Sequence, residues 1–242
     1  MPVGYTEWAA PAALRPAVAC VWARVTTKEA DRESLVLPDA CTDLIWQQGR
    51  GAYVAGPDTG PVPTQVAAGT VILGVRFRPS AGGSALGLPL SELRDLRVDF
   101  ADLDPAQARR LPAALDAGTA AARMLDVAAG LVDAGPPDPA VTRAVTLLRD
   151  PRARTEDVAA QVGLSLRQLR RRCHAAVGYG PKTLQRVLRF HGFVSRIDRC
   201  QHPGDLAALA AEAGYADQAH LTRECVRLAG LTPAALARQR TA

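Results

Sequence analysis

Short runs in the first hundred residues alternate between apolar and polar positions, which is the pattern of half-buried β-strands. In the most regular run, Leu73 and Val75 fall on one face and Arg76 on the other. Pro, Gly and Asp residues separate the runs, as they separate the strands of a small sheet. The predicted strands are 34–37, 42–47, 52–55 and 70–77.

After about residue 105 the apolar residues recur with the spacing of helices, over 106–118 and then over 121–132. The segment DAGPPDPA at 133–140 stops this pattern, because its three prolines and one glycine can continue neither a helix nor a central strand. Everything after it is helical in pattern. We therefore predict a mixed α+β domain over 1–136 and an all-α domain over 137–242, and we expect the second to fold by itself.

The all-α half contains an internal repeat. Each copy is a short helix, a turn with a glycine, a second amphipathic helix and then Gly-x-x-Pro. Thr155 is placed to cap the first of these helices, and a longer helix that begins at Pro181 joins the two copies. This is the plan of a helix-turn-helix unit, whose second helix enters the major groove of DNA. Helix pairs also repeat in interaction scaffolds, but these usually need three or more copies. The matching segments are VAAQVG (158–163) and LAAEAG (209–214), LRRRC (169–173) and LTREC (221–225), and VGYGPKTL (177–184) and AGLTPAAL (229–236).

The segment LSLRQLRRRCHAAVG at 164–178 is the second helix of the first copy. At 100° per residue its apolar residues form one narrow seam, with Ser165 placed to cap the helix and Gly178 to end it. The seam consists of Leu166, Leu169, Cys173 and Val177. Arg167, Arg171 and His174 lie on one flank, Arg170 lies at its border, and Gln168 and Arg172 lie on the other flank. A solvated charged face is the alternative to a surface that reads DNA.

Charge is divided unevenly between the two halves. Residues 137–242 carry 17 Arg and Lys against 9 Asp and Glu, a net charge of +8. Residues 1–136 carry 12 against 15, a net charge of −3. A basic half beside a mildly acidic one predicts that the helical half faces a polyanion. Together with the repeat, this asymmetry favours DNA binding over a solvated face.

Two helix-turn-helix units, each followed by Gly-x-x-Pro, make residues 140–240 resemble the AraC/XylS family of bacterial transcription regulators. The segments DVAAQVGLSLRQLRRRC and LAAEAGYADQAHLTREC carry this resemblance. It implies that two helices dock in successive major-groove segments on one face of the DNA. By position it also implies base contacts from Arg167, Arg170 and Arg171 in the first unit and from Gln218, Thr222 and Arg223 in the second.

The resemblance has departures. Cys173 and Cys225 stand where the family usually has Phe, and because both fall on apolar seams we expect buried thiols rather than a redox pair. Ala219 stands at the position that matches Arg167. The first half is similar to the family only through PDACTDLIW and GVRFRP, and this implies a sensor or dimerisation domain.

A ligand site in the N-terminal half is a weaker hypothesis. Its candidate residues are Asp43, Trp46, Arg76 and Arg78. Arg76 and Arg78 share a predicted strand face and could hold an anion. The alternatives are that Arg76 pairs with Asp39 or Asp43 and that Trp46 lies in the core. No histidine precedes His174, which excludes a Cys–His or Ser–His–Asp site within this half.

We expect no metal and no cofactor. The cysteines are scattered without a Cys-x-x-Cys pair, which argues against a disulfide framework and a structural zinc site. Cys200 and His202 are two residues apart, but two ligands do not make a metal site. The cysteines are Cys20, Cys41, Cys173, Cys200 and Cys225.

We therefore predict a sequence-specific DNA-binding transcription regulator, not an enzyme. The chain start is a poor signal peptide and the longest apolar run, 71–75, is too short to span a bilayer, so we expect a cytoplasmic protein without a membrane partner. Its expected partners are double-stranded DNA and RNA polymerase, and the resemblance leaves room for a small-molecule effector and a homodimer. The alternative is an enzyme or small-molecule binding module whose helical half serves protein interaction.

Overall fold

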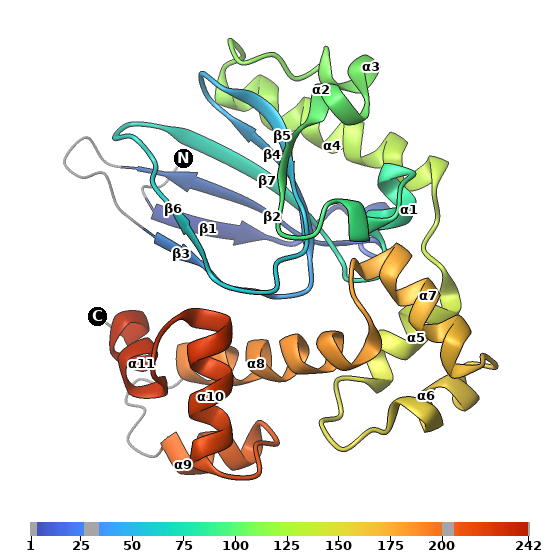
Figure 1. Ribbon diagram of the computed structural model, residues 1–242. Helices are drawn as coiled ribbons and strands as arrows, with labels where there is room; N and C mark the ends of the chain where they lie inside the picture. The colour runs from blue at the N-terminus through green and yellow to red at the C-terminus, as the bar shows by residue number, and fades with distance from the viewer. Residues whose placement is uncertain (1–3, 27–33, 200–205, 242) are drawn as a thin grey trace.

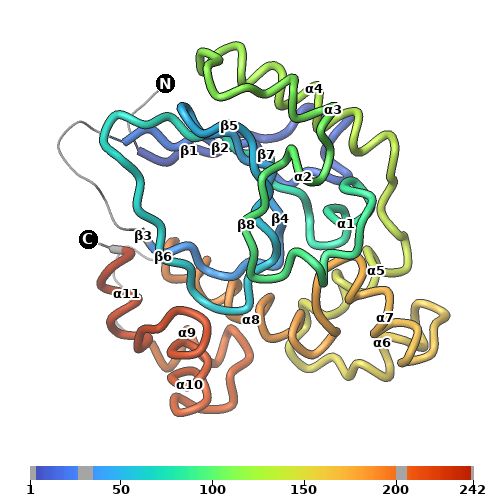
Figure 2. Tube along the Cα trace, turned by 45° about the horizontal axis from the view of Figure 1, so that its top comes forward, coloured from blue at the N-terminus to red at the C-terminus, as the bar shows by residue number. Residues whose placement is uncertain are grey.

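The computed structural model describes residues 4–26, 34–199 and 206–241, with strands in the N-terminal part and helices in the C-terminal part (Figure 1). Six strands form an antiparallel sheet in the order β1-β2-β7-β4-β5-β8, and β3 pairs with β6 in a separate sheet. The tube in Figure 2 shows that the strands curve rather than lie flat. The strands are β1 (Gly4–Trp8), β2 (Val18–Val25), β3 (Ser34–Val36), β4 (Thr42–Gln47), β5 (Gly51–Ala55), β6 (Val62–Thr64), β7 (Val71–Phe77) and β8 (Arg97–Asp99).

The predicted α+β part followed by an all-α part is confirmed. The four predicted strands form β3, β4, β5 and β7, with ends that differ by at most one residue. The alternation pattern misses β1, β2, β6 and β8. β2 lies inside the sheet between β1 and β7 and is almost entirely apolar, so it lacks the alternation of a half-buried strand. β6 and β8 have three residues each, too few to show a period.

The sheet has two different faces. Leu73, Val75 and Trp46 belong to the main N-terminal core, which is completed by the long helix α4 (Ala117–Ala134). Ile72 and Trp22 belong to a smaller apolar cluster on the opposite face. The alternation predicted along β7 is therefore present in the structure.

The remaining N-terminal elements are short. The predicted helix over 106–118 is wrong, because only one helical turn forms there and α4 begins at Ala117, after its N-cap Asp116. Pro112 interrupts the segment between them, since proline removes a backbone donor and crowds the preceding turn. The predicted helix over 121–132 lies within α4. The short elements are α1 (Gly82–Leu86), α2 (Phe100–Leu103), α3 (Pro105–Ala108) and the 3₁₀ helices η1 (Ala12–Leu14) and η2 (Leu90–Glu92).

The C-terminal part contains seven described helices. Thr155 is not the cap that the sequence suggests: Arg154 occupies the N-cap position, and Thr155 is the first helical residue with its side chain buried. Among the described helices of the chain, none is long and apolar enough to cross a membrane. The C-terminal helices are α5 (Pro139–Leu147), α6 (Thr155–Gln161), α7 (Leu166–Val177), α8 (Pro181–Arg199), α9 (Leu206–Glu212), α10 (Gln218–Ala229) and α11 (Pro233–Thr241).

The two copies of the repeat have the same local geometry, α6–α7 and α9–α10. α7 and α10 each have 12 residues. The turn glycines Gly163 and Gly214 have φ angles of 69° and 81°, and Gly178 and Gly230, which end α7 and α10, have 88° and 68°. Glycine reaches this left-handed region without a steric penalty. Both copies share one continuous core with α8, which joins them.

The N-terminal and helical parts touch directly beside α7. A Cβ added to Gly178 would lie 2.5 Å from Cγ of Pro57, and one added to Gly83 of α1 would lie 2.5 Å from the carbonyl oxygen of Ala175. Contacts this close leave no room for a side chain at either glycine. Ala40, from the loop before β4, is itself buried in the core of the helical part. The C-terminal end of α7 is therefore packed against the N-terminal part.

Candidate DNA-binding surface

Helix α7 begins with a capping box. The Ser165 hydroxyl accepts a hydrogen bond from the backbone N–H of Gln168 at 3.2 Å, and the Gln168 side-chain oxygen accepts one from the Ser165 N–H at 2.8 Å. Three residues of the predicted seam are fully buried: Leu169, Cys173 and Val177. The prediction that the fourth, Leu166, belongs to the buried seam is wrong, because Leu166 is 44% exposed at the first position of the helix.

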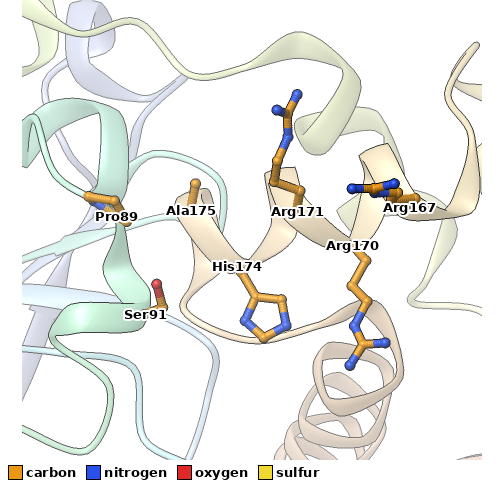
Figure 3. Close-up of a pocket in the computed structure, with 7 residues that line it drawn as sticks. All are labelled: Pro89, Ser91, Arg167, Arg170, Arg171, His174 and Ala175. Atoms are coloured by element: carbon orange, nitrogen blue, oxygen red, sulfur yellow. The ribbon is translucent and has the colours of Figure 1, made fainter.

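Three arginines of α7 are exposed, and none has an ion pair with any other described residue: Arg167, Arg170 and Arg171. They line an open pocket of about 490 Å³ together with Pro89, Ser91, His174 and Ala175. Figure 3 shows Arg170 and His174 extending to the same side of the helix and Arg171 to the other. Unpaired guanidinium groups keep all their donors free for an anion or a base edge.

Arg172 differs from these three. Its Nη1 donates to Oδ2 of Asp138, the N-cap residue of α5, at 3.1 Å. This agrees with the expectation that Arg172 lies on the other flank of the seam from Arg167 and Arg171. The ion pair holds α7 to α5 and removes Arg172 from the exposed basic group.

Positively charged side chains surround His174 of α7. Burial lowers the pKa of His174, and the positive charges of Arg170 and of Arg94 in the N-terminal part lower it further. The contributions of the two arginines, as distinct from that of burial, show that positive charge lies near His174, and positive charge favours a bound anion.

Helix α10 presents a less basic surface. Its N-cap Asp217 accepts a hydrogen bond from the N–H of His220 at 2.6 Å. Gln218 and Arg223 are exposed, whereas the hydroxyl of Thr222 donates to the Gln218 carbonyl oxygen at 2.8 Å. The buried side is formed by Leu221, Cys225, Leu228 and Ala229.

The two cysteines at equivalent positions of α7 and α10 are both fully buried. Burial raises the pKa of each thiol, Cys173 and Cys225, to about 12. A thiol that stays protonated at neutral pH is a poor nucleophile, so both behave as small apolar residues of the core. Cys200 lies outside the described residues.

The four ligand candidates of the N-terminal part do not converge. Asp43 and Arg76 meet, with Nε of Arg76 at 3.2 Å from Oδ1 of Asp43, and Arg76 also pairs with Asp39 at 3.4 Å. Trp46 is fully buried in the core on the other face of the sheet, and its Nε1 donates to the Pro112 carbonyl at 3.0 Å. Arg78 donates from Nε to the carbonyl of Arg15 at 2.8 Å, away from Arg76.

The charged cluster around Arg76 includes residues that the pattern did not single out. Nε1 of Trp22 donates to Oδ1 of Asp43 at 2.7 Å, and Glu7 lies 3.3 Å from Nη1 of Arg76. Burial raises the pKa of Asp43 to about 6, although Arg76 acts in the opposite direction. Trp22 and Glu7 belong to β2 and β1, two of the strands that alternation misses, so only strand pairing reveals the cluster. No group of three or more potential metal ligands occurs among the described residues.

Comparison with known families identifies the helical part. Residues 158–239 match a family described as a helix-turn-helix domain. This is an AraC-type helix-turn-helix domain. This match supports the resemblance drawn from residues 140–240, and the helical part is a DNA-binding domain of the AraC type. Residues 6–99 match a second family, described as a domain of unknown function.

Two structures of ToxT from Vibrio cholerae are similar in overall arrangement. One shares 9% identity with this chain, with a TM-score of 0.49, and the match covers 92% of this chain and 99% of the ToxT chain. The other, an apo form from strain SCE256, shares 10% identity, with a TM-score of 0.48, and covers 90% of this chain and 97% of ToxT. No curated protein sequence matches the chain.

Proposed function

We propose that this AraC-type regulator recognises a specific DNA sequence with α7 and α10, each placed in the major groove. The observation that carries the proposal is the group of three exposed, unpaired arginines on α7. A guanidinium can donate two hydrogen bonds to O6 and N7 of guanine, and this pairing discriminates between bases by about 1–3 kcal/mol. Arg167, Arg170 and Arg171 are therefore proposed as reading residues of the first unit.

The second unit is proposed to read the adjacent groove segment. α8 has 19 residues and is therefore about 28 Å long at 1.5 Å per residue. Successive major-groove segments on one face of DNA are about 34–36 Å apart. α7 lies near the start of α8 and α10 packs against α8, and the length of α8 that joins the two units is comparable to this separation (Figure 1). Gln218, Thr222 and Arg223 are the proposed reading residues of α10.

Control is assigned to the N-terminal part, residues 1–136, as a sensor or dimerisation domain. Its direct packing against α7 at Gly178 and Gly83 means that a ligand or partner bound there has a path to the DNA-reading surface. A small-molecule effector, a second copy of the chain and RNA polymerase are the proposed partners besides DNA. The protein would act in the cytoplasm, where bacterial DNA lies.

Selection of binding sites from random duplex DNA with the full chain tests this function. We expect two enriched blocks whose centres are about 10–10.5 base pairs apart. Affinity for the selected site should fall log-linearly with salt, by roughly 0.9 log units per decade for each phosphate neutralised. No enriched sequence together with a flat salt response would instead favour a helical half that binds protein.

A further inference from the structure

The pocket beside α7 has two walls from distant parts of the chain. One wall is α7 itself, and the other is a segment of the N-terminal part that contributes Pro89 and Ser91 (Figure 3). The two lining residues flank Leu90, which is buried, so the backbone of this segment is anchored while its neighbours face the opening. Any molecule that occupies the exposed side of α7 near His174 and Ala175 therefore also meets the N-terminal part.

This second wall is held firmly against α7. A Cβ on Gly178 would lie 3.0 Å from the carbonyl oxygen of Leu90, and η2 and α1 both pack on α7. Packing this close is found in protein interiors rather than in mobile contacts. The wall therefore accompanies α7 when the helix docks on a partner.

The wall continues the basic character of α7. Arg94 follows η2, is 44% exposed, and is close enough to His174 to disfavour its cationic form. Its only ion-pair partner among the described residues is Asp95, at 3.9 Å, and an exposed pair at this distance contributes little. The Ser91 hydroxyl has no hydrogen-bond partner within the described part of the chain. Glu92, exposed on η2, is the acidic residue of segment 89–94, and it does not line the pocket.

We propose that segment 89–94 is a second wall of the DNA-binding surface, in which the Ser91 hydroxyl and the Arg94 guanidinium bind backbone phosphates beside the groove that α7 occupies. The inference rests on the proposed function, because it requires α7 to dock on DNA. Hydroxyl and guanidinium groups are common phosphate ligands, and such contacts position a protein without reading sequence. The N-terminal part then contributes to DNA affinity directly, not only through control of the helical part.

The test uses the full chain with Arg94→Ala and Ser91→Ala, measured on the selected site and on random duplex DNA over a range of salt concentrations. Arg94→Ala should weaken binding to both DNAs alike, by up to roughly tenfold at 0.1 M salt, and should reduce the salt slope by about 0.9. Ser91→Ala should weaken both DNAs by a smaller factor and leave the slope unchanged, because it removes no charge. Ser91→Asp should weaken binding more than Ser91→Ala, since it places a negative charge against phosphate.

Two controls separate this role from a structural one. Arg94→Lys keeps the charge and should retain the wild-type salt slope. Arg109, an exposed arginine after α3, is a matched surface position away from the pocket, and Arg109→Ala should change neither affinity nor slope. Wild-type affinity and slope in Arg94→Ala and Ser91→Ala would overturn the inference, and so would tighter binding, which would mean that the wall obstructs DNA. If the wild-type chain itself shows no salt-dependent DNA binding, the proposed function is wrong, and this outcome is distinct from a failure of the inference about segment 89–94 alone.

Discussion

The two helix-turn-helix units share a backbone plan but expose different chemistry. The three proposed reading residues of the first unit are Arg167, Arg170 and Arg171, and the positions that match them in the second unit hold Ala219, Thr222 and Arg223. The first unit thus presents three guanidinium groups where the second presents one. The next position is Arg172 in one and Glu224 in the other, and both are held in ion pairs, with Asp138 at 3.1 Å and with Arg186 at 3.2 Å.

The units also differ in how they meet the N-terminal part. The glycine that ends α7, Gly178, is packed against Pro57 and Leu90. An added Cβ at Gly230, which ends α10, would meet only Cγ of Pro61 among the described residues, at 3.7 Å. Both units keep a capped helix start, a terminal glycine and a buried apolar side, which any helix-turn-helix needs. Their surfaces differ, and this difference gives the first unit both the greater charge and the closer link to the N-terminal part.

The largest expected effect on DNA binding is on sequence reading by the first unit. Arg167→Ala and Arg171→Ala should each weaken the selected site relative to random DNA by about 1–3 kcal/mol, because each removes a guanidinium that can pair with guanine. Competitive binding to the selected site and to its single-base variants measures this. Arg172→Ala is the control, since Arg172 is already paired with Asp138, and it should leave specificity unchanged. Relaxed specificity in Arg172→Ala alone would mean that the other face of α7 reads DNA.

A second prediction concerns the packing of the two terminal glycines. Gly230→Ala should lower the free energy of unfolding by about 1–2 kcal/mol, the cost of a left-handed conformation for a residue with a Cβ. Gly178→Ala should lower it by about 1–3 kcal/mol more, because the new methyl group must also displace Pro57 or the Leu90 backbone. Denaturant unfolding of the two variants gives the difference. Equal losses in both variants would contradict the tight contact between α7 and the N-terminal part.

The smallest effect is a gain in the second unit. Ala219 is exposed at the position equivalent to Arg167, so Ala219→Arg should add one phosphate or base contact without disturbing the core. Affinity for random DNA should rise several-fold at moderate salt, and the salt slope should steepen by about 0.9. A salt titration of the variant beside the wild type measures both. An unchanged slope would place this face of α10 away from DNA.

Much of the helical part could be predicted because its signals are local. The seam of α7, the cap at Ser165 and the left-handed Gly178 all depend on residues within one or two turns of each other. The repeat strengthens each of these signals, because two copies of one plan that differ by a single extra residue after the turn glycine do not arise by chance. The errors were also local: Leu166 and Thr155 lie at helix starts, where burial depends on the neighbouring element rather than on period.

The N-terminal part could be predicted less well, because strands are defined by their partners. β2 has no alternation, and only its pairing with β1 and β7 brings Trp22 to Asp43. Arg76 and Arg78 are two residues apart, as side chains on one strand face are, but their partners, Asp43 and the Arg15 carbonyl, come from separate parts of the chain.

The sequence by itself determined the class of protein. Helical periodicity, glycine turns and net charge each depend on residues close together in the chain or on composition, and together they specify a basic pair of helix-turn-helix units. Only the tertiary structure decided which surfaces meet. It left Arg167, Arg170 and Arg171 unpaired, engaged Arg172 with Asp138, and set Ser91 and Pro89 beside α7. These contacts join residues dozens of positions apart in the chain. They depend on how the two parts pack together, and a local sequence pattern contains no information about that packing.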